Sequence, residues 1–316
     1  MKPASKSSLL VIVGPTATGK TALSLDIAKH FPIEIISGDS VQVYRGMDIG
    51  SAKATAEERK LVPHHLIDMM DPDEPFSAAD FQQRAVQTIE EIAGRGRLPV
   101  IVGGTGLYIE SVVYGYRFAE AAHDEAVRDK WRAFADRYGD AALHEALSER
   151  DPVSAGRIHP NDRKRLIRAL EVMEVTGGPM NALAQKREKT SPYRLAMIGL
   201  TMERAKLYER IEQRVDEMIE RGLPEEVERL LRQGYGEHLP SMQAIGYKEM
   251  AAWLNGRCSF EDAVRILKRN SRRFAKRQLS WFRTMPQIQW FDMSDPANFR
   301  THSAAINDIL LSVFYS

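Results

Sequence analysis

One segment of the chain has the residue types and spacing of a phosphate-binding loop: Gly14-Pro15-Thr16-Ala17-Thr18-Gly19-Lys20-Thr21. It fits the pattern G-x-x-x-x-G-K-[ST], whose glycines let the backbone curl until successive N–H groups point at an anion. The lysine adds a point charge, the threonine hydroxyl suits Mg²⁺, and a helix that starts here adds its positive end. The pattern predicts a phosphate site and leaves open which phosphate it holds.

Two further polar side chains follow apolar runs that are typical of strands. Asp39 comes after Ile36-Ser37-Gly38, and Thr105 lies in the glycine-rich run 103–106 after Val100-Ile101-Val102. Ligands of open α/β sheets bind beyond the carboxyl ends of the strands, so both side chains are expected near the phosphate loop. Asp39 could bind Mg²⁺, act as a general base or cap a turn. The second run offers a hydroxyl where a hydrolytic nucleotidase usually has an acid, which argues against a motor or switch NTPase.

Basic residues cluster in two places. The first cluster is Arg163-Lys164-Arg165-Leu166-Ile167-Arg168. In the second, a helical wheel puts one set of cations on one side and Leu267, Phe274 and Trp281 on the other; the cations are Arg265, Lys268, Arg269, Arg272, Arg273, Lys276 and Arg283. This arrangement predicts an anchored helix with a basic stripe for nucleic acid, and a solvated charged face is the alternative.

Two smaller features leave their roles open. Arg210 and Arg214 lie four residues apart on an expected helix over 205–221, either as an exposed pair or with one guanidinium reaching the phosphate pocket. Adjacent His64 and His65 point apart on an extended chain with no third ligand near in sequence, so a structural role is expected rather than a metal site.

The elements that must position these residues alternate between strands and helices. Strands are expected at 9–13, 33–37, 100–103, 195–201 and 288–291, and helices at 22–30 and 78–94. Near-continuous apolar strands of this kind form a parallel sheet covered on both faces. The stretch 120–193 is helical by periodicity, which predicts an all-helical insertion. We therefore expect an α/β fold: a P-loop NTPase-like core with a parallel sheet, formed by 1–119 and 194–316 and including C-terminal helices, and an insertion at 120–193.

The bulk properties limit the class of protein. The chain has 316 residues, with Lys+Arg 44 against Asp+Glu 43, so any polyanion site must come from local clustering. The lone Cys258 rules out a disulfide framework within the chain and fits a reducing compartment. The polar start and the lack of a long apolar run predict a cytoplasmic protein with no membrane partner. Without a coiled-coil pattern, a monomer is expected.

Taken together, the pieces resemble the tRNA dimethylallyltransferase family, which prenylates an adenine in the tRNA anticodon loop. The likeness runs from about Leu9 to about Phe291. Beyond the phosphate loop, the family-like segments are Ser37–Gly50, Val62–Asp68, Val102–Tyr108, Asn161–Glu171 and Lys276-Arg277-Gln278 with Trp281-Phe282. The phosphate loop is shared with many kinases, whereas the first of these segments and the run 103–108 are far more specific.

The resemblance implies that the loop 14–21 holds the diphosphate of dimethylallyl diphosphate, with Mg²⁺ on Thr21 and with Arg214, or second Arg210, reaching the leaving group. Asp39 would take the proton of adenine N6, and Thr105 would orient it or the amine. The adenine would be extruded from the anticodon loop into a channel between core and insertion. The implied tRNA-binding residues are Asp39, Ser40, Val41, Gln42, Thr105, Arg128, Arg163, Lys164, Arg165, Leu166, Ile167, Arg168, Arg272, Arg273, Lys276 and Arg277.

Three alternatives stay open on the sequence alone. An adenylate isopentenyltransferase would prenylate free AMP, ADP or ATP, although the basic clusters and the insertion favour a bulky RNA. A small-molecule P-loop kinase would need a nucleoside triphosphate site. A non-catalytic RNA-binding protein would leave Asp39 and Thr105 beside the phosphate loop unexplained.

Overall fold

The structure, a computed structural model, describes residues 6–116, 118, 124–178 and 190–315, and the chain divides into two compact units. The first unit combines Met1–Gly115 with Ser191–Ser316, and the second is Tyr116–Thr190. Each unit is described by itself. In the described residues no helix is both long enough and apolar enough to cross a bilayer.

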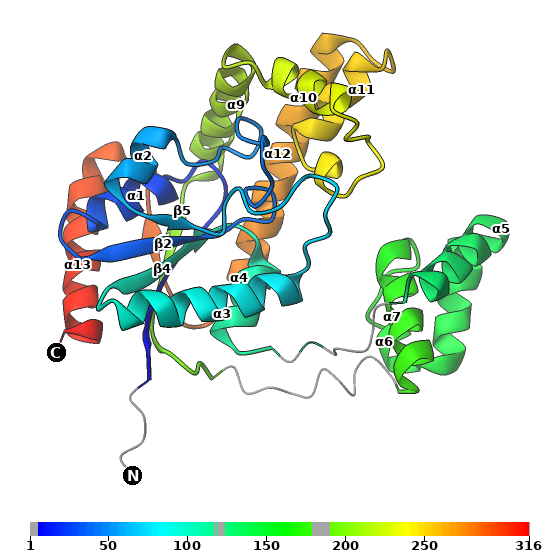
Figure 1. The fold of residues 1–316 in the computed structure, drawn as a ribbon, viewed down its shortest axis with the longest axis horizontal. Helices are drawn as coiled ribbons and strands as arrows, with labels where there is room; N and C mark the ends of the chain where they lie inside the picture. Colours follow the sequence, from blue (N-terminus) through cyan, green and yellow to red (C-terminus); the bar gives the residue numbers. More distant parts are fainter. Residues whose placement is uncertain (1–5, 117, 119–123, 179–189, 316) are drawn as a thin grey trace. The chain divides into compact units, whose positions relative to one another are not determined.

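A six-stranded sheet lies at the centre of the first unit (Figure 1), with strand order β3-β2-β4-β1-β5-β6 and parallel pairing throughout. Its strands are β1 (Ser8–Val13), β2 (Ile33–Gly38), β3 (His64–His65), β4 (Leu98–Gly103), β5 (Arg194–Thr201) and β6 (Ile288–Asp292). The central strands are apolar and buried on both faces, as a parallel sheet between helices requires. The predicted α/β architecture is therefore confirmed.

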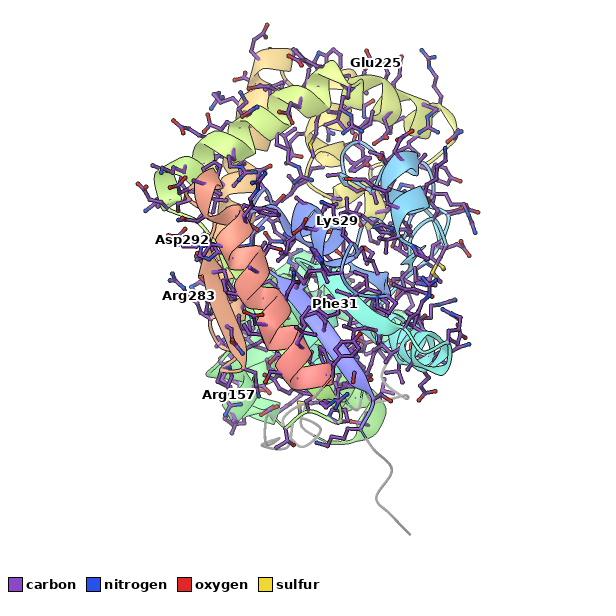
Figure 2. The ribbon with its side chains drawn as sticks, turned by 90° about the vertical axis from the view of Figure 1, so that its left-hand side faces the viewer. Lys29, Phe31, Arg157, Glu225, Arg283 and Asp292 are labelled. Atoms are coloured by element: carbon purple, nitrogen blue, oxygen red, sulfur yellow. The ribbon has the colours of Figure 1, made fainter. Side chains whose placement is uncertain are left out.

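Helices cover both faces of this sheet (Figure 1). On one face α1 (Lys20–Ile27) and α13 (Phe299–Phe314) pack against the strands, and on the other α3 (Ala78–Gly94) packs with α4 (Gly106–Val113). Figure 2 views the unit from the side that α13 covers. There Phe31 stacks on Tyr315 with ring centroids 5.6 Å apart. The short helix α2 (Ala56–Leu61) begins with a capping box at Thr55 and Glu58.

A further group of helices extends the first unit and packs around its own apolar cluster. Val227, Met242, Tyr247 and Leu267 are buried there together with residues of the 43–47 loop. The helices are α9 (Arg204–Glu220), α10 (Leu223–Arg232), α11 (Tyr247–Leu254) and α12 (Phe260–Phe282), with a short 3-10 turn at Ser241–Gln243. A second 3-10 turn, Pro296–Asn298, directly precedes α13.

The second unit consists of helices α5 (Glu125–Arg150), α6 (Pro152–Ala155) and α7 (Arg163–Thr176) in its described residues. Trp131, Leu143, Leu147, Leu166 and Leu170 form its buried core. α5 is kinked at Gly139, whose positive φ of 86° suits a residue without a side chain.

Three elements differ from the sequence predictions. The first helix begins at Lys20 instead of Ala22, because Gly19 takes a left-handed conformation (φ 92°) that ends the loop sharply. The strand β3 is only two residues long, too short to give a periodic signal. The C-terminal segment, for which no element was predicted, forms α13 and buries Ile306, Leu310 and Phe314 in the main core.

Candidate active site

The register of the sheet brings the phosphate loop, Asp39 and Thr105 to one edge. Val13 of β1 and Gly38 of β2 both align with Gly103 of β4, so the three strands end level with one another. The residues that follow each strand therefore leave the sheet together, as expected for a ligand site of an open α/β sheet.

The phosphate loop is held in shape by its own backbone and by its threonine and lysine side chains. The Thr18 hydroxyl donates to the Pro15 carbonyl at 2.8 Å. Lys20 Nζ donates to the carbonyls of Gly14 (3.0 Å) and Pro15 (2.8 Å). Gly14 admits no side chain, because a Cβ there would lie 2.4 Å from the Leu200 carbonyl oxygen. The loop thus leaves Thr16, Ala17, Gly19 and the exposed Thr21 facing a cavity.

Asp39 is fixed by the turn after β2. Its Oδ1 accepts hydrogen bonds from the backbone N–H groups of Val41 (2.8 Å) and Gln42 (3.4 Å). Thr105 supports the same turn from β4: its Oγ1 accepts from Ser40 N at 3.0 Å, and its own N–H donates to Gly38 O at 3.1 Å. Asp39 therefore caps a turn and also lines the cavity.

Burial and charge shift the titration of three groups around this cavity. Burial raises the pKa of Asp39, against the two backbone hydrogen bonds and the positive charges of Lys20 and Arg214. Burial and the Arg214 guanidinium lower the pKa of Lys20 to about 7, and Asp39 opposes that shift. Burial also lowers the pKa of Arg214. The site therefore holds a carboxyl group with a raised pKa together with two basic side chains whose pKa values are lowered.

Two adjoining cavities lie at this edge of the sheet. The larger, about 620 Å³, is lined by the phosphate loop, Asp39, Arg210 and Arg214. The smaller, about 330 Å³, is lined by residues 243–246 and by apolar side chains of α9 and α12. Thr16, Asp39, Arg214 and Phe274 line both. The structure thus brings together Asp39 and the two arginines from α9, of which Arg210 is exposed and Arg214 partly buried.

Gln278 is a site residue that the sequence analysis named only within a family-like segment, with no role of its own. Its Oε1 accepts from Thr16 N at 2.9 Å, and its Nε2 donates to Gly104 O at 3.1 Å. One buried amide on α12 therefore ties the phosphate loop to the glycine-rich run after β4. The signal in the sequence was an uncharged polar residue on a helix face otherwise formed by small and apolar side chains.

The glycines after β4 make this contact possible. A Cβ on Gly103 would lie 2.2 Å from Gly38 O, one on Gly104 would lie 2.0 Å from Gln278 Nε2, and one on Gly106 would lie 2.4 Å from Trp281 Cδ1. The run 103–106 consequently lets α12 approach the end of β4 directly.

The basic stripe predicted on α12 is not continuous. Lys268 and Arg272 are partly buried and form ion pairs with Asp216 and Glu212 of α9, whereas the sequence analysis had grouped both with freely presented cations. The exposed cations are Arg265, Arg269, Arg273, Lys276, Arg277 and Arg283. The buried face also differs, since Phe274 lines the cavities and the helix is anchored by Ala263, Leu267, Ser271, Ala275, Gln278 and Phe282.

An open hollow of about 740 Å³ lies beside the exposed part of α12. It is lined by Arg273, Lys276, Arg277 and Trp281, with Glu110, Ser280 and Thr284. Cations and an aromatic ring around a hollow are suited to a phosphate backbone with neighbouring bases.

In the second unit, the basic cluster of α7 is divided by burial. The side chains of Leu166 and Ile167 lie in the helical core and cannot reach a ligand, which corrects their assignment to tRNA binding. Lys164 and Arg165 are exposed, and Arg165 pairs with Asp162 at 3.4 Å.

The remaining arginines of this cluster have acidic partners. Arg163 pairs with Asp136 and Asp140, at 2.6 and 2.5 Å. Arg168 and Arg128 both contact the buried carboxylate of Glu171, at 2.8 and 2.9 Å. Arg128 thereby joins α5 to α7, and Arg168 pairs with Glu171 within α7, so both arginines have a structural role.

Three further side chains that the sequence singled out, Gln42, His64 and His65, have internal partners. Gln42 is fully engaged: its Oε1 accepts from Ser37 Oγ, and its Nε2 donates to the carbonyls of Ser51 and Ala52. His65 Nε2 lies 2.7 Å from Glu34 Oε2, and His64 Nδ1 lies 2.8 Å from Val62 O. Within the described ranges no group of three or more His, Cys, Asp or Glu side chains could hold a metal ion.

Comparisons with known proteins agree with this geometry. Residues 42–285 match the model of the family described as IPP transferase. A tRNA dimethylallyltransferase of Moorella thermoacetica is 53% identical over 312 residues, which cover 97% of this chain and 96% of the relative.

Two solved structures are similar over nearly the whole chain. The full-length tRNA isopentenylpyrophosphate transferase of Bacillus halodurans has a TM-score of 0.74 and 50% identity, covering 97% of this chain and 96% of its own. A eukaryotic dimethylallyltransferase, described as acting on tRNA, has a TM-score of 0.82 at 29% identity, covering 97% of this chain and 78% of its own.

Proposed function

The chain belongs to the IPP transferase family, and from that premise we propose how it acts as a tRNA dimethylallyltransferase. It transfers a dimethylallyl group from dimethylallyl diphosphate to N6 of adenine 37 in the anticodon loop of tRNAs that read codons starting with U, and it releases diphosphate. The observation that carries this proposal is the cavity that Asp39 shares with the phosphate loop and Arg214.

The larger cavity binds the diphosphate of the donor. The backbone amides of the loop 14–21 and Lys20 surround the phosphates, and Arg214, or Arg210 from the more exposed position, contacts the leaving group. These hydrogen-bonding and cationic groups lie where negative charge develops, so they stabilise the departing diphosphate most when cleavage of the C1–O bond is advanced. The hydrogen bonds of Lys20 to its own loop carbonyls give way to phosphate contacts when the donor binds.

Mg²⁺ fits this cavity as a partner of the donor. The exposed Thr21 hydroxyl lines the cavity beside the loop, and one hydroxyl with diphosphate oxygens and water is a coordination sphere that Mg²⁺ accepts. When bound there, the ion would neutralise charge on the diphosphate.

Asp39 is the general base in this proposal. The lone pair of adenine N6 is delocalised into the ring, so N6 attacks C1 well only if its proton leaves as the new bond forms. The N6–C1 bond forms, the C1–O bond breaks with its electrons on the diphosphate, and the N6 proton moves to Asp39. Its raised pKa makes it a better base than an ordinary carboxylate. Thr105 fixes the turn that carries Asp39.

The exposed cations bind tRNA phosphates. Arg273, Lys276 and Arg277 around the hollow on α12 are the main candidates, and Lys164 and Arg165 serve in the second unit. Ser40 and Val41, next to Asp39 in the smaller cavity, contact the extruded base. All these groups come from one chain, so a monomer suffices. Because its substrate is tRNA, we propose a cytoplasmic enzyme.

The test is transfer of radiolabelled dimethylallyl from its diphosphate, with Mg²⁺, to unmodified tRNA containing A36-A37-A38, with free AMP as a competing acceptor. Label in the tRNA alone is expected. Label in AMP would instead favour an adenylate isopentenyltransferase. Hydrolysis of ATP without any labelled acceptor would contradict the assignment of the phosphate loop.

A further inference from the structure

Glu226, which has no part in the steps above, is a buried carboxylate that binds a row of backbone amides. It lies in the first turn of α10 and is 6% exposed. Its oxygens accept from Asp48 N at 3.0 Å, Ile49 N at 2.9 Å and Gly50 N at 3.1 Å, and also from the Tyr247 hydroxyl at 2.7 Å. Three successive N–H groups that converge in this way form an anion-binding nest, and here the anion is a side chain of the protein itself.

The same contact brings the 48–50 backbone directly onto α11. Tyr247 is fully buried, and a Cβ on Gly50 would lie 2.6 Å from Tyr247 Cε2. Gly50 therefore has no room for a side chain, and Glu226 and Tyr247 together determine how closely this backbone approaches the helices.

Two polar side chains outside α10 and α11 also bind segment 48–52. Gln42, which follows β2, donates to the carbonyls of Ser51 (3.1 Å) and Ala52 (3.2 Å). The buried Lys53 donates to Asp48 Oδ1 at 2.6 Å. Segment 48–52 is thus fixed between the strand that leads to Asp39 and the helices α10 and α11.

This segment forms a wall of both cavities. Ser51 and Ala52 line the larger and the smaller cavity, and Gly50 lines the smaller one together with Gly246. A displacement of segment 48–52 would change this wall of both cavities, including the part of the smaller cavity next to Asp39, while the phosphate loop that holds the diphosphate stays in place.

We propose that Glu226 is a positioning residue for the acceptor: it fixes the wall against which the target adenine is placed beside Asp39. The inference rests on the proposed function, in which the phosphate loop takes the donor and the smaller cavity takes the base. A carboxylate is needed because it only accepts hydrogen bonds, and all its neighbours here are donors. An amide of the same shape would turn an NH₂ group toward one of those donors.

The test compares Glu226→Gln with Glu225→Gln, which removes the same charge from the exposed neighbouring residue of the same helical turn (Figure 2). For Glu226→Gln we expect kcat/KM for tRNA to fall by about 10–100-fold, the range for misplacement of reacting groups by about 1 Å. The KM for dimethylallyl diphosphate should stay within about twofold. Glu225→Gln should match the wild type, and Glu226→Asp, which keeps a carboxylate, should recover part of the loss.

Amide hydrogen exchange of residues 48–50 gives a second measurement that does not depend on turnover. Exchange should become faster in Glu226→Gln and remain unchanged in Glu225→Gln. If kcat/KM for tRNA and the KM for dimethylallyl diphosphate worsen to the same extent, Glu226 only supports folding. If both values and the exchange rate match the wild type, the inference is also refuted. If the wild type transfers no label, the proposed function fails, whereas the exchange result still decides whether Glu226 holds the wall.

Discussion

Gly104→Ala tests the contact between α12 and the phosphate loop. The added Cβ would lie 2.0 Å from Gln278 Nε2, which is closer than any non-bonded contact allows. The amide is the end of a flexible side chain and can swing away, but it then loses its bonds to Thr16 N and Gly104 O. Because Gly104 does not have a positive φ, the backbone itself accepts alanine. The cost should therefore arise from Gln278 and not from strain at position 104.

The magnitude follows from the two hydrogen bonds. Each is worth about 0.5–1.5 kcal/mol net, so Gly104→Ala should lower the free energy of unfolding by about 1–3 kcal/mol. In a Gln278→Ala background the clashing atoms are gone, and the next neighbour of the new Cβ is Gly14 O at 3.8 Å, an ordinary contact. The second substitution should then be neutral, or stabilising by about 0.4–1 kcal/mol through the unfolded state.

The assay is a double-mutant cycle in urea denaturation, with kcat/KM for tRNA measured on the same four proteins. We expect a coupling energy of about 1–3 kcal/mol. Gly94→Ala is the matched control, because nothing lies within 4 Å of a Cβ there, and its effect should be equal in both backgrounds. If Gly104→Ala and Gln278→Ala add to within about 0.5 kcal/mol, the amide does not join the two loops.

Four other predictions concern the proposed reaction. Asp39→Asn should reduce kcat by about 10²–10⁴-fold with tRNA affinity nearly unchanged, as measured by single-turnover kinetics and filter binding; retained turnover would rule out the base. Asp39 acts as a base only when its carboxyl group has lost its proton. Because its pKa is raised, this happens at a pH above the ordinary aspartate pKa of about 3.9. The acid limb of the kcat/KM profile should therefore lie above that value. The residual activity of Asp39→Asn should lack this acid limb. If the variant keeps the limb, another group is responsible for it. Arg214→Ala should raise the KM for dimethylallyl diphosphate more than the KM for tRNA, and equal changes would argue against diphosphate contact. Removal of Arg273 and Lys276 charges should weaken tRNA binding and reduce the slope of log K against log salt by about 0.7–0.9 per lost contact; a constant slope would exclude both from the RNA interface.

The sequence was sufficient for five of the six strands and for the residues at the carboxyl edge of the sheet. Long apolar runs give a strong strand signal, and a turn residue directly after a strand has little freedom in where it lies. Asp39 and Thr105 could be placed together for this reason, and the structure supports their meeting at one edge.

Partners from distant parts of the chain could not be predicted in the same way. Gln278 meets Thr16, and Glu226 meets residues 48–50, across 262 and about 177 positions respectively. Helical periodicity identifies the face a side chain occupies but not the helix that packs on it. The pattern of α12 therefore gives no sign that Asp216 and Glu212 of α9 pair with Lys268 and Arg272.

The order of the strands has a consequence for synthesis of the chain on the ribosome. β1 acquires β4 as a neighbour once Gly103 has emerged, but its other neighbour, β5, begins only at Arg194. During translation of the intervening roughly 90 residues, at about 5–20 residues per second, one edge of a strand that is apolar from Leu9 to Val13 stays open for about 5–18 seconds. The intervening residues include a unit with its own core, which can form while the edge waits. An open apolar edge is a site for mispairing between nascent chains, so slow translation or premature termination between 104 and 193 should expose this enzyme to aggregation and to chaperone capture.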